Sequence, residues 1–116
     1  MCPCGSGSSY DDCCGPLVRN ERAAVGVEEL MRSRYTAYVL RDLNHLFRTW
    51  HPRTRPEDLA PEEGLTWTGL EVVEVTDDEV TFRAHWAYAG KTGTLHERST
   101  FVQRAGRWVY LEGVPL

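Results

Sequence analysis

The four cysteines of this chain, Cys2, Cys4, Cys13 and Cys14, all lie near its beginning, and the rest of its 116 residues contain none. Deprotonated thiols are preferred zinc ligands, and four of them complete a tetrahedral, structural site. A disulfide framework would instead spread its cysteines so as to connect distant segments. The clustering therefore favours one structural Zn²⁺ per chain. Zinc storage or redox sensing at the adjacent Cys13 and Cys14 is an alternative.

The residues between the cysteine pairs suit a chain that wraps tightly around an ion. Gly5 and Gly7 can adopt positive φ at little cost. Ser6 and its neighbours can form hydrogen bonds with local backbone amides, and those amides can donate to the thiolate sulfurs. Such hydrogen bonds around the ligands tune a metal site. We expect Tyr10 to cover this small knuckle with its ring.

The string CPCGSGSSYDDCC resembles the SEC-C motif, a short zinc-binding module of the SecA tail and of many unrelated proteins. Every fixed position of that motif is matched, namely Cys2, Cys4, Gly5, Ser6, Gly7, Tyr10, Cys13 and Cys14. The resemblance implies that the four cysteines bind zinc. In the SecA tail the motif resembles a basic docking tag for a chaperone. The variable positions here are serine and aspartate, so the same partner is not implied.

Apolar spacing predicts two helices after the knuckle. The first begins at Val27 and carries a stripe made of Val27, Leu30, Met31, Arg34, Tyr35 and Tyr38. Its other face is expected to hold Glu28, Glu29, Arg32, Ser33 and Thr36. A second helix spans Leu43 to Trp50, with Asp42 as its cap, and ends before Pro52. Residues 52–64 are expected to form a loop with one helical turn at 56–59.

The remainder of the chain has the alternation of β-strands. Strands are expected at 66–76, 80–88, 94–104 and 107–112, with turns at 77–78, 90–93 and 105–106. Sequential hairpins of this kind form an antiparallel meander. Helices followed by such a sheet predict an α+β domain.

Four strings in order, LMRSRYTAYVLRD, TWHPRTRP, LHERSTFV and GRWVYLEG, resemble the YchJ-like family across essentially the whole chain. The resemblance implies a SEC-C zinc knuckle over residues 1–18 and an NTF2-like domain over 19–116. In that fold the N-terminal helices pack on a curved antiparallel sheet and form a cone. The resemblance implies no particular activity.

Several polar residues are candidates for a site inside the cone. Glu97 shares a strand face with Phe101, and Arg34 lies on the apolar stripe of the first helix. One hypothesis makes Glu97 and His51 a catalytic acid–base pair, with Arg34 or Arg55 holding an anionic substrate. The structural alternative is a buried ion pair between Arg34 and Glu97, or an Arg34 that reaches out along the edge of the stripe. Tryptophans in a cone are usually core residues, but Trp67 and Trp86 are candidates to line a ligand pocket.

Composition narrows the class of partner. Thirteen Lys and Arg against seventeen Asp and Glu give a net charge of -4, which argues against nucleic acid. Apolar runs are too short to span a membrane, and no signal-peptide pattern opens the chain. We therefore expect a cytoplasmic, zinc-stabilised module that binds a protein or a small ligand, with a homodimer as one option. A small enzyme that uses the cone pocket is the alternative.

Overall fold

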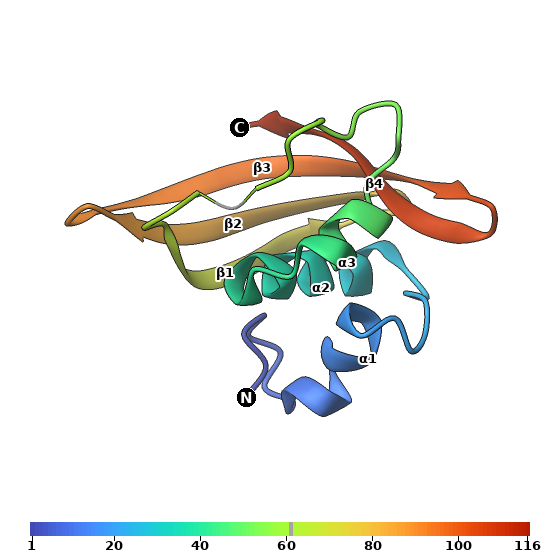
Figure 1. The fold of residues 1–116 in the computed structure, drawn as a ribbon, viewed down its shortest axis with the longest axis horizontal. Coiled ribbons are helices and arrows are strands. Elements are labelled where there is room, and N and C mark those ends of the chain that lie inside the picture. Colours follow the sequence, from blue (N-terminus) through green and yellow to red (C-terminus); the bar gives the residue numbers. More distant parts are fainter. Residues whose placement is uncertain (61) are drawn as a thin grey trace.

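The computed structural model describes residues 1–60 and 62–116, and a four-stranded antiparallel sheet is its largest element (Figure 1). The strands follow the sequence order β1–β2–β3–β4. Their bounds are β1 Thr66–Val75, β2 Glu79–Tyr88, β3 Lys91–Arg104 and β4 Arg107–Pro115. The predicted meander is confirmed, because each strand pairs with the one before it.

Local chemistry explains where the strands turn and bend. The β2–β3 and β3–β4 hairpins both turn through an Ala-Gly pair in which both residues have positive φ, as a two-residue hairpin with the right twist requires. Shifts of register in the pairing between Trp67 and Gly69 and between Val72 and Glu74 mark irregularities in β1. Such irregularities bend a strand and increase its twist. The sheet consequently has a concave face that can receive a helix.

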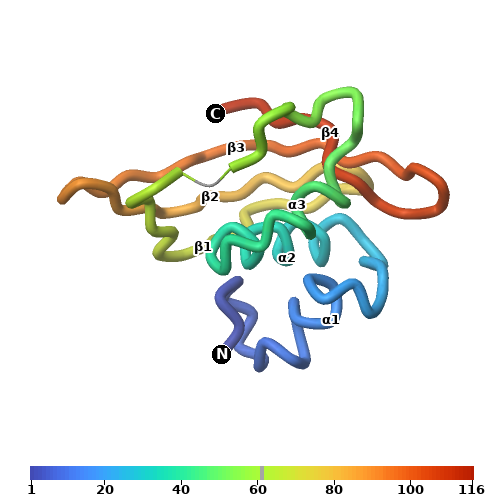
Figure 2. Tube along the Cα trace, in the orientation of Figure 1, coloured from blue at the N-terminus to red at the C-terminus, as the bar shows by residue number. Residues whose placement is uncertain are grey.

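The helices lie on one face of this sheet (Figures 1 and 2). A short 3₁₀ turn, η1 (Tyr10–Asp12), and α1 (Gly15–Val18) precede the main helix α2 (Val27–Leu40) and the shorter α3 (Leu43–Arg48). Glu28 and Glu29 occupy the first turn of α2, where the helix dipole favours acidic groups. Asp42 caps α3 as predicted, since its carboxylate accepts a hydrogen bond from the His45 amide at 3.1 Å. No helix in the described part of the chain is long and apolar enough to cross a membrane.

Helix α2 is buried on more of its circumference than its apolar stripe predicts. Ser33 and Thr36, expected on the outer face, are both fully buried. Ser33 contacts His45 of α3, and Thr36 contacts the sulfur of Cys2. The reason is that α2 is a middle layer, with the sheet on one side, the cysteine segment and α1 on the other, and α3 alongside it (Figure 1).

The segment after α3 runs beside the outer strand β4. The backbone amide of Tyr110 donates to Thr49, and the amide of His51 donates back to Tyr110, which forms a short parallel bridge. This segment satisfies backbone hydrogen-bonding groups of Tyr110 on the outer edge of β4. Unpaired strand edges otherwise tend to pair with other chains. The structure has no helical turn at residues 56–59, so that expectation was wrong.

The expected bounds of the β2–β3 connection, a turn at 90–93 and a strand from 94, were also wrong, since β3 begins at Lys91. Gly93 belongs to β3 and not to the turn, because the hairpin closes more tightly, at Ala89 and Gly90. A Cβ atom added to Gly93 would lie 2.2 Å from the indole ring of Trp86 on the neighbouring strand. The missing side chain of Gly93 therefore leaves room for the Trp86 indole, which lies over this glycine.

Candidate metal centre and binding cavity

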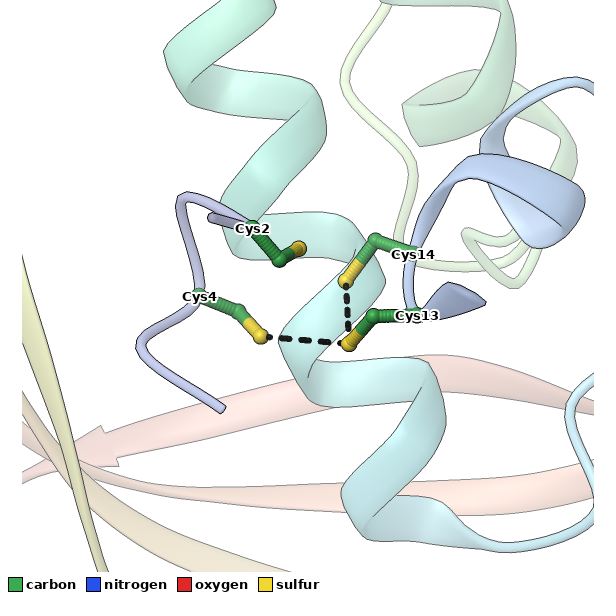
Figure 3. Close-up of side chains that lie close together, drawn as sticks. All are labelled: Cys2, Cys4, Cys13 and Cys14. Carbon is green, nitrogen blue, oxygen red and sulfur yellow. Dashed lines mark hydrogen bonds between the residues drawn. The ribbon is translucent and has the colours of Figure 1, made fainter. Parts of the chain in front are cut away.

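The four cysteine sulfurs converge on one point beside α2 (Figure 3). All four Sγ atoms lie within 4.8 Å of one another, the Cys4–Cys13 pair at 3.6 Å and the Cys13–Cys14 pair at 3.9 Å. A tetrahedral zinc with Zn–S bonds of about 2.3 Å requires sulfurs about 3.8 Å apart. None of the cysteines forms a disulfide. The donor set and its spacing thus fit one tetrahedral metal ion.

The loop between the cysteine pairs is closed by its own backbone. The Cys2 amide donates to Ser8 at 2.7 Å, and the Cys13 amide donates to Tyr10 at 3.1 Å. Gly5 and Gly7 have φ of 81° and 88°, the left-handed conformation that their residue type permits. The hydroxyl of Ser6 donates to the sulfur of Cys13 at 3.1 Å. These bonds help to hold the two pairs of thiols close together.

The thiols of Cys4, Cys13 and Cys14 differ in pKa. Hydrogen bonding from the Cys14 thiol holds the pKa of Cys4 down at about 4, while the same bond and burial raise the pKa of Cys14. The Cys4 thiol therefore ionises more readily than those of Cys13 and Cys14, whose pKa values are raised. A divalent cation is the group that allows all four to ionise together.

The cysteine knuckle is part of the hydrophobic core. Cys2, Cys4 and Cys14 are 4%, 0% and 2% exposed, and they belong to the same cluster as Leu30 and Met31 of α2. Arg32 of α2 donates to the carbonyl oxygen of Cys4 at 2.9 Å, and its guanidinium brings positive charge beside the thiolates. The cysteine cluster and the long helix are accordingly one packed unit.

A cavity of about 320 Å³ lies on the opposite side of α2, between that helix and the sheet. Aromatic side chains dominate its wall. Its residues include Tyr35, Tyr38, Trp50, Trp67, Phe101 and Tyr110. Arg34 and Glu97 supply its charged groups, as the helical stripe and the strand alternation predicted. A largely apolar cavity with a few polar groups is the usual form of a small-molecule site.

Arg34 is the most buried charge in this cavity, at 6% exposed. Its guanidinium lies against the rings of both Trp50 and Tyr110, 4.9 and 4.7 Å from their centroids. Nη1 donates to the Leu46 carbonyl at 3.2 Å and to the Thr49 hydroxyl at 2.7 Å. Burial lowers the pKa of Arg34 to about 10, so the group keeps its charge at neutral pH.

Glu97 faces the same cavity without forming an ion pair with Arg34. Among the described residues, no carboxylate oxygen comes within 4.0 Å of the Arg34 guanidinium. The Glu97 carboxylate instead accepts a hydrogen bond from Ser99 at 2.8 Å. It lies over Gly113 of β4, where an added Cβ would meet it at 2.2 Å. The cavity consequently presents a cation and an anion that are not neutralised by each other at close range.

The remaining sequence candidates lie elsewhere. His51 is not among the residues that line the cavity, and its Nδ1 accepts a hydrogen bond from the Arg53 amide. Arg55 lies over the ring of Phe47, 3.7 Å from its centroid, outside the cavity. Trp67 lines the cavity, whereas Trp86 does not. The structure therefore brings Arg34, Glu97 and Trp67 together and leaves His51, Arg55 and Trp86 apart from them.

Sequence reasoning missed a buried polar cluster between α2 and α3. His45 is 2% exposed, and its Nε2 lies 2.8 Å from the hydroxyl of Ser33. The Arg48 guanidinium donates to Nδ1 at 3.2 Å, so the ring proton must reside on Nε2. Ser33 in turn donates to the Leu30 carbonyl at 2.7 Å. A histidine in this tautomer cannot accept a proton from Ser33, so the pair holds α3 against α2 and is no nucleophile.

Comparison with protein families gives two matches along the chain. Residues 1–16 match the SEC-C motif, and residues 26–113 match the middle, NTF2-like domain of YchJ. A UPF0225 protein of Streptomyces coelicolor is 49% identical over 119 residues, covering 97% of this chain and 93% of that protein. The chain belongs to the YchJ-like, UPF0225 family. A UPF0225 protein of Deinococcus radiodurans is also 49% identical, covering 96% of this chain and 86% of its own.

Two solved structures extend the YchJ-like family assignment to the fold. A SEC-C motif-containing protein from Rhodopseudomonas palustris matches with a TM-score of 0.86 and 36% identity, covering 99% of this chain and 98% of its own. A second such protein, from Psychrobacter arcticus, matches with a TM-score of 0.74 and 27% identity, covering 97% and 80% of the two chains. The NTF2-like α+β fold is thereby confirmed, with the cysteine cluster at its N-terminus.

Proposed function

We propose that this YchJ-like protein is a zinc-stabilised module that binds a small ligand in its cone cavity. The convergence of four thiol sulfurs within 4.8 Å carries the proposal, because this donor set is typical of structural zinc. Cys2, Cys4, Cys13 and Cys14 would hold the ion. Four protein ligands leave no open position, so the zinc would contribute stability and not catalysis.

The cavity supports ligand binding as the second half of the proposal. Its aromatic wall suits an apolar body, and the buried Arg34 guanidinium suits an anionic group such as a carboxylate. Glu97, on the same wall, would accept a hydrogen bond from a donor on the ligand. The acid–base enzyme hypothesis has less support, because the His51 that it requires lies outside the cavity.

The metal is tested first, on untagged protein purified without chelator. We expect elemental mass spectrometry to find about one zinc per chain, and thiol titration to find protected cysteines until a chelator is added. Cys14→Ser is the informative variant, since it removes a buried ligand. Val25, which is 84% exposed, gives a matched control as Val25→Ser. Zinc content near zero in the unmodified protein would refute the metal half of the proposal.

The cavity is tested with 4-phenylbutyrate and its neutral amide as probes of the zinc-loaded protein. If Arg34 pairs with the carboxylate, the acid should bind at least about tenfold more tightly than the amide by calorimetry. Ala84→Leu adds volume at the cavity wall and should weaken binding. Val73→Leu, at an exposed strand position, is the control. Equal affinities for acid and amide would contradict the role given to Arg34.

A further inference from the structure

A second hollow, of about 290 Å³, is lined in part by residues of the β3–β4 turn and of the loop between α1 and α2. These two segments lie at the same end of the molecule (Figure 1). Five of the chain's thirteen basic residues converge on the hollow. We call it the arginine groove, defined by Arg22, Arg48, Arg55, Arg104 and Arg107. It is separate from the cone cavity except for Trp50, which contributes to both walls.

The positive charge of the groove is largely unneutralised. Its lining contains no aspartate or glutamate among the residues that the structure describes. Arg22 alone of the five forms an ion pair within that part of the chain, with Glu29 at 2.7 Å. Arg48 and Arg55 donate instead to carbonyl oxygens, of Val18 at 3.1 Å and of Phe47 at 3.3 Å. These bonds orient two guanidinium groups and leave their charge intact.

The hairpin at the rim of the groove adds a repulsive pair. Arg104 and Arg107 are direct partners across the β3–β4 ladder, on either side of the Ala105–Gly106 turn. Like charges directly opposite each other destabilise a hairpin. The chain carries this arrangement although its net charge is -4, so basic residues are not in general excess. A bound anion is the group that would offset the repulsion.

Apolar and aromatic side chains accompany the arginines. Leu17, Leu30 and Val109, all buried, line the groove together with Trp50 and Trp108. An anion such as free phosphate needs no such surface, whereas an organic anion with a flat or apolar body does. Guanidinium groups match the geometry of phosphate oxygens and bind them in bidentate fashion.

We propose that the arginine groove binds a small phosphorylated molecule, with its phosphates at Arg48, Arg55, Arg104 and Arg107 and an aromatic body against the tryptophans. The volume of about 290 Å³ lies near the lower end of small-molecule sites, which favours a mononucleotide-sized ligand over a polymer. This site goes beyond the proposed function, because it lies outside the cone cavity and does not use Arg34 or Glu97.

The test measures binding of ADP, inorganic pyrophosphate and adenosine to the full, zinc-loaded chain by calorimetry. We expect ADP to bind with a dissociation constant below about 1 mM. Pyrophosphate should bind more weakly than ADP, adenosine more weakly still, and added salt should weaken the binding of ADP. The double variant R104Q/R107Q should reduce ADP affinity at least about tenfold, since it removes two phosphate contacts.

The matched control is R83Q/R98Q, which removes the same charge from exposed arginines of the same sheet, outside the groove. It should leave ADP affinity unchanged within about twofold if binding is local and not a general charge effect. Folding is monitored independently by thermal unfolding. R104Q/R107Q should melt no lower than the unmodified protein, because it removes a like-charge pair.

Three outcomes would overturn the proposal. The first is that no phosphorylated probe binds at millimolar concentration. The second is that both double variants lose affinity equally, which would indicate non-specific attraction. The third is that an eight-nucleotide single-stranded DNA binds far more tightly than ADP, which would indicate a polymer site. Loss of 4-phenylbutyrate binding in the cone leaves the groove result unaffected, so the two proposals fail separately.

Discussion

Acid should destabilise the protein through His45, which is buried as a neutral ring. Burial, and to a lesser extent the positive charges of Arg48 and Arg34, lower the pKa of His45 to about 4. The negative charge of Asp42 raises this pKa and so offsets part of the shift. Protonation would place an N–H on Nδ1, where the Arg48 guanidinium already donates. The ring therefore remains neutral in the folded protein over a pH range in which it becomes charged in the unfolded chain.

The size of the effect follows from linkage. An unfolded histidine has a pKa of about 6.5, so the unfolded chain binds more protons between about pH 6.5 and pH 4. The free energy of unfolding consequently decreases as pH falls through this window. The loss is about 2 kcal/mol between pH 7.5 and pH 5, and about 3 kcal/mol once the pH is below both values.

The assay is urea unfolding in excess zinc at pH 7.5 and pH 5.0, for the unmodified protein and for His45→Gln. Glutamine can still donate to Ser33 but does not titrate, so its stability should fall by about 2 kcal/mol less over this interval. Protonation of the cysteine ligands weakens zinc binding equally in both proteins and cancels in the comparison. His96→Gln, whose side chain lies at the partly exposed surface of β3, is the control and should behave like the unmodified protein. Identical losses in all three proteins would refute the reasoning.

Three further substitutions test other contacts. Thr36→Val keeps the shape of a buried residue but removes the hydroxyl 3.7 Å from the Cys2 sulfur, so a chelator competition should show zinc affinity reduced by about tenfold. Gly93→Ala places a Cβ against the Trp86 ring and should lower the free energy of unfolding by about 1–3 kcal/mol, measured with urea. Gly113→Ala displaces the Glu97 carboxylate instead, which can move, so the free energy of unfolding in urea should fall less than in Gly93→Ala while 4-phenylbutyrate affinity changes.

Local patterns predicted the elements of this fold because each element follows a simple period. The alternation that placed Glu97 on the face of Phe101, and the helical spacing that placed Arg34 on the stripe of α2, were both sufficient to bring these residues to one cavity. The cysteine spacing likewise predicted a cluster, since both pairs are close in sequence and joined by glycines. In each case the information lies within a few consecutive residues.

The remaining contacts depend on how elements pack, which local patterns do not contain. Ser33 and Thr36 are buried because α2 has neighbours on both sides. The helical spacing of apolar residues does not indicate which other element a polar residue will contact. His51 is held away from the cavity by backbone pairing with Tyr110, a residue far along the chain. The arginine groove is likewise assembled from separate parts of the sequence, so its charge becomes visible only in three dimensions.

Helix α2 connects the two halves of the proposed function. The cavity on its sheet side leaves part of the helix without packing contacts, and a domain of 116 residues has little other core to compensate for them. Its other side packs on Cys2, Cys4 and Cys14, whose burial lies within the range of the aliphatic core residues. A metal that fixes these thiols would therefore hold the helix from the side opposite the cavity. Under the proposed function, a small chain can keep an open cavity because the stabilisation that the cavity removes would be restored by the metal across the same helix.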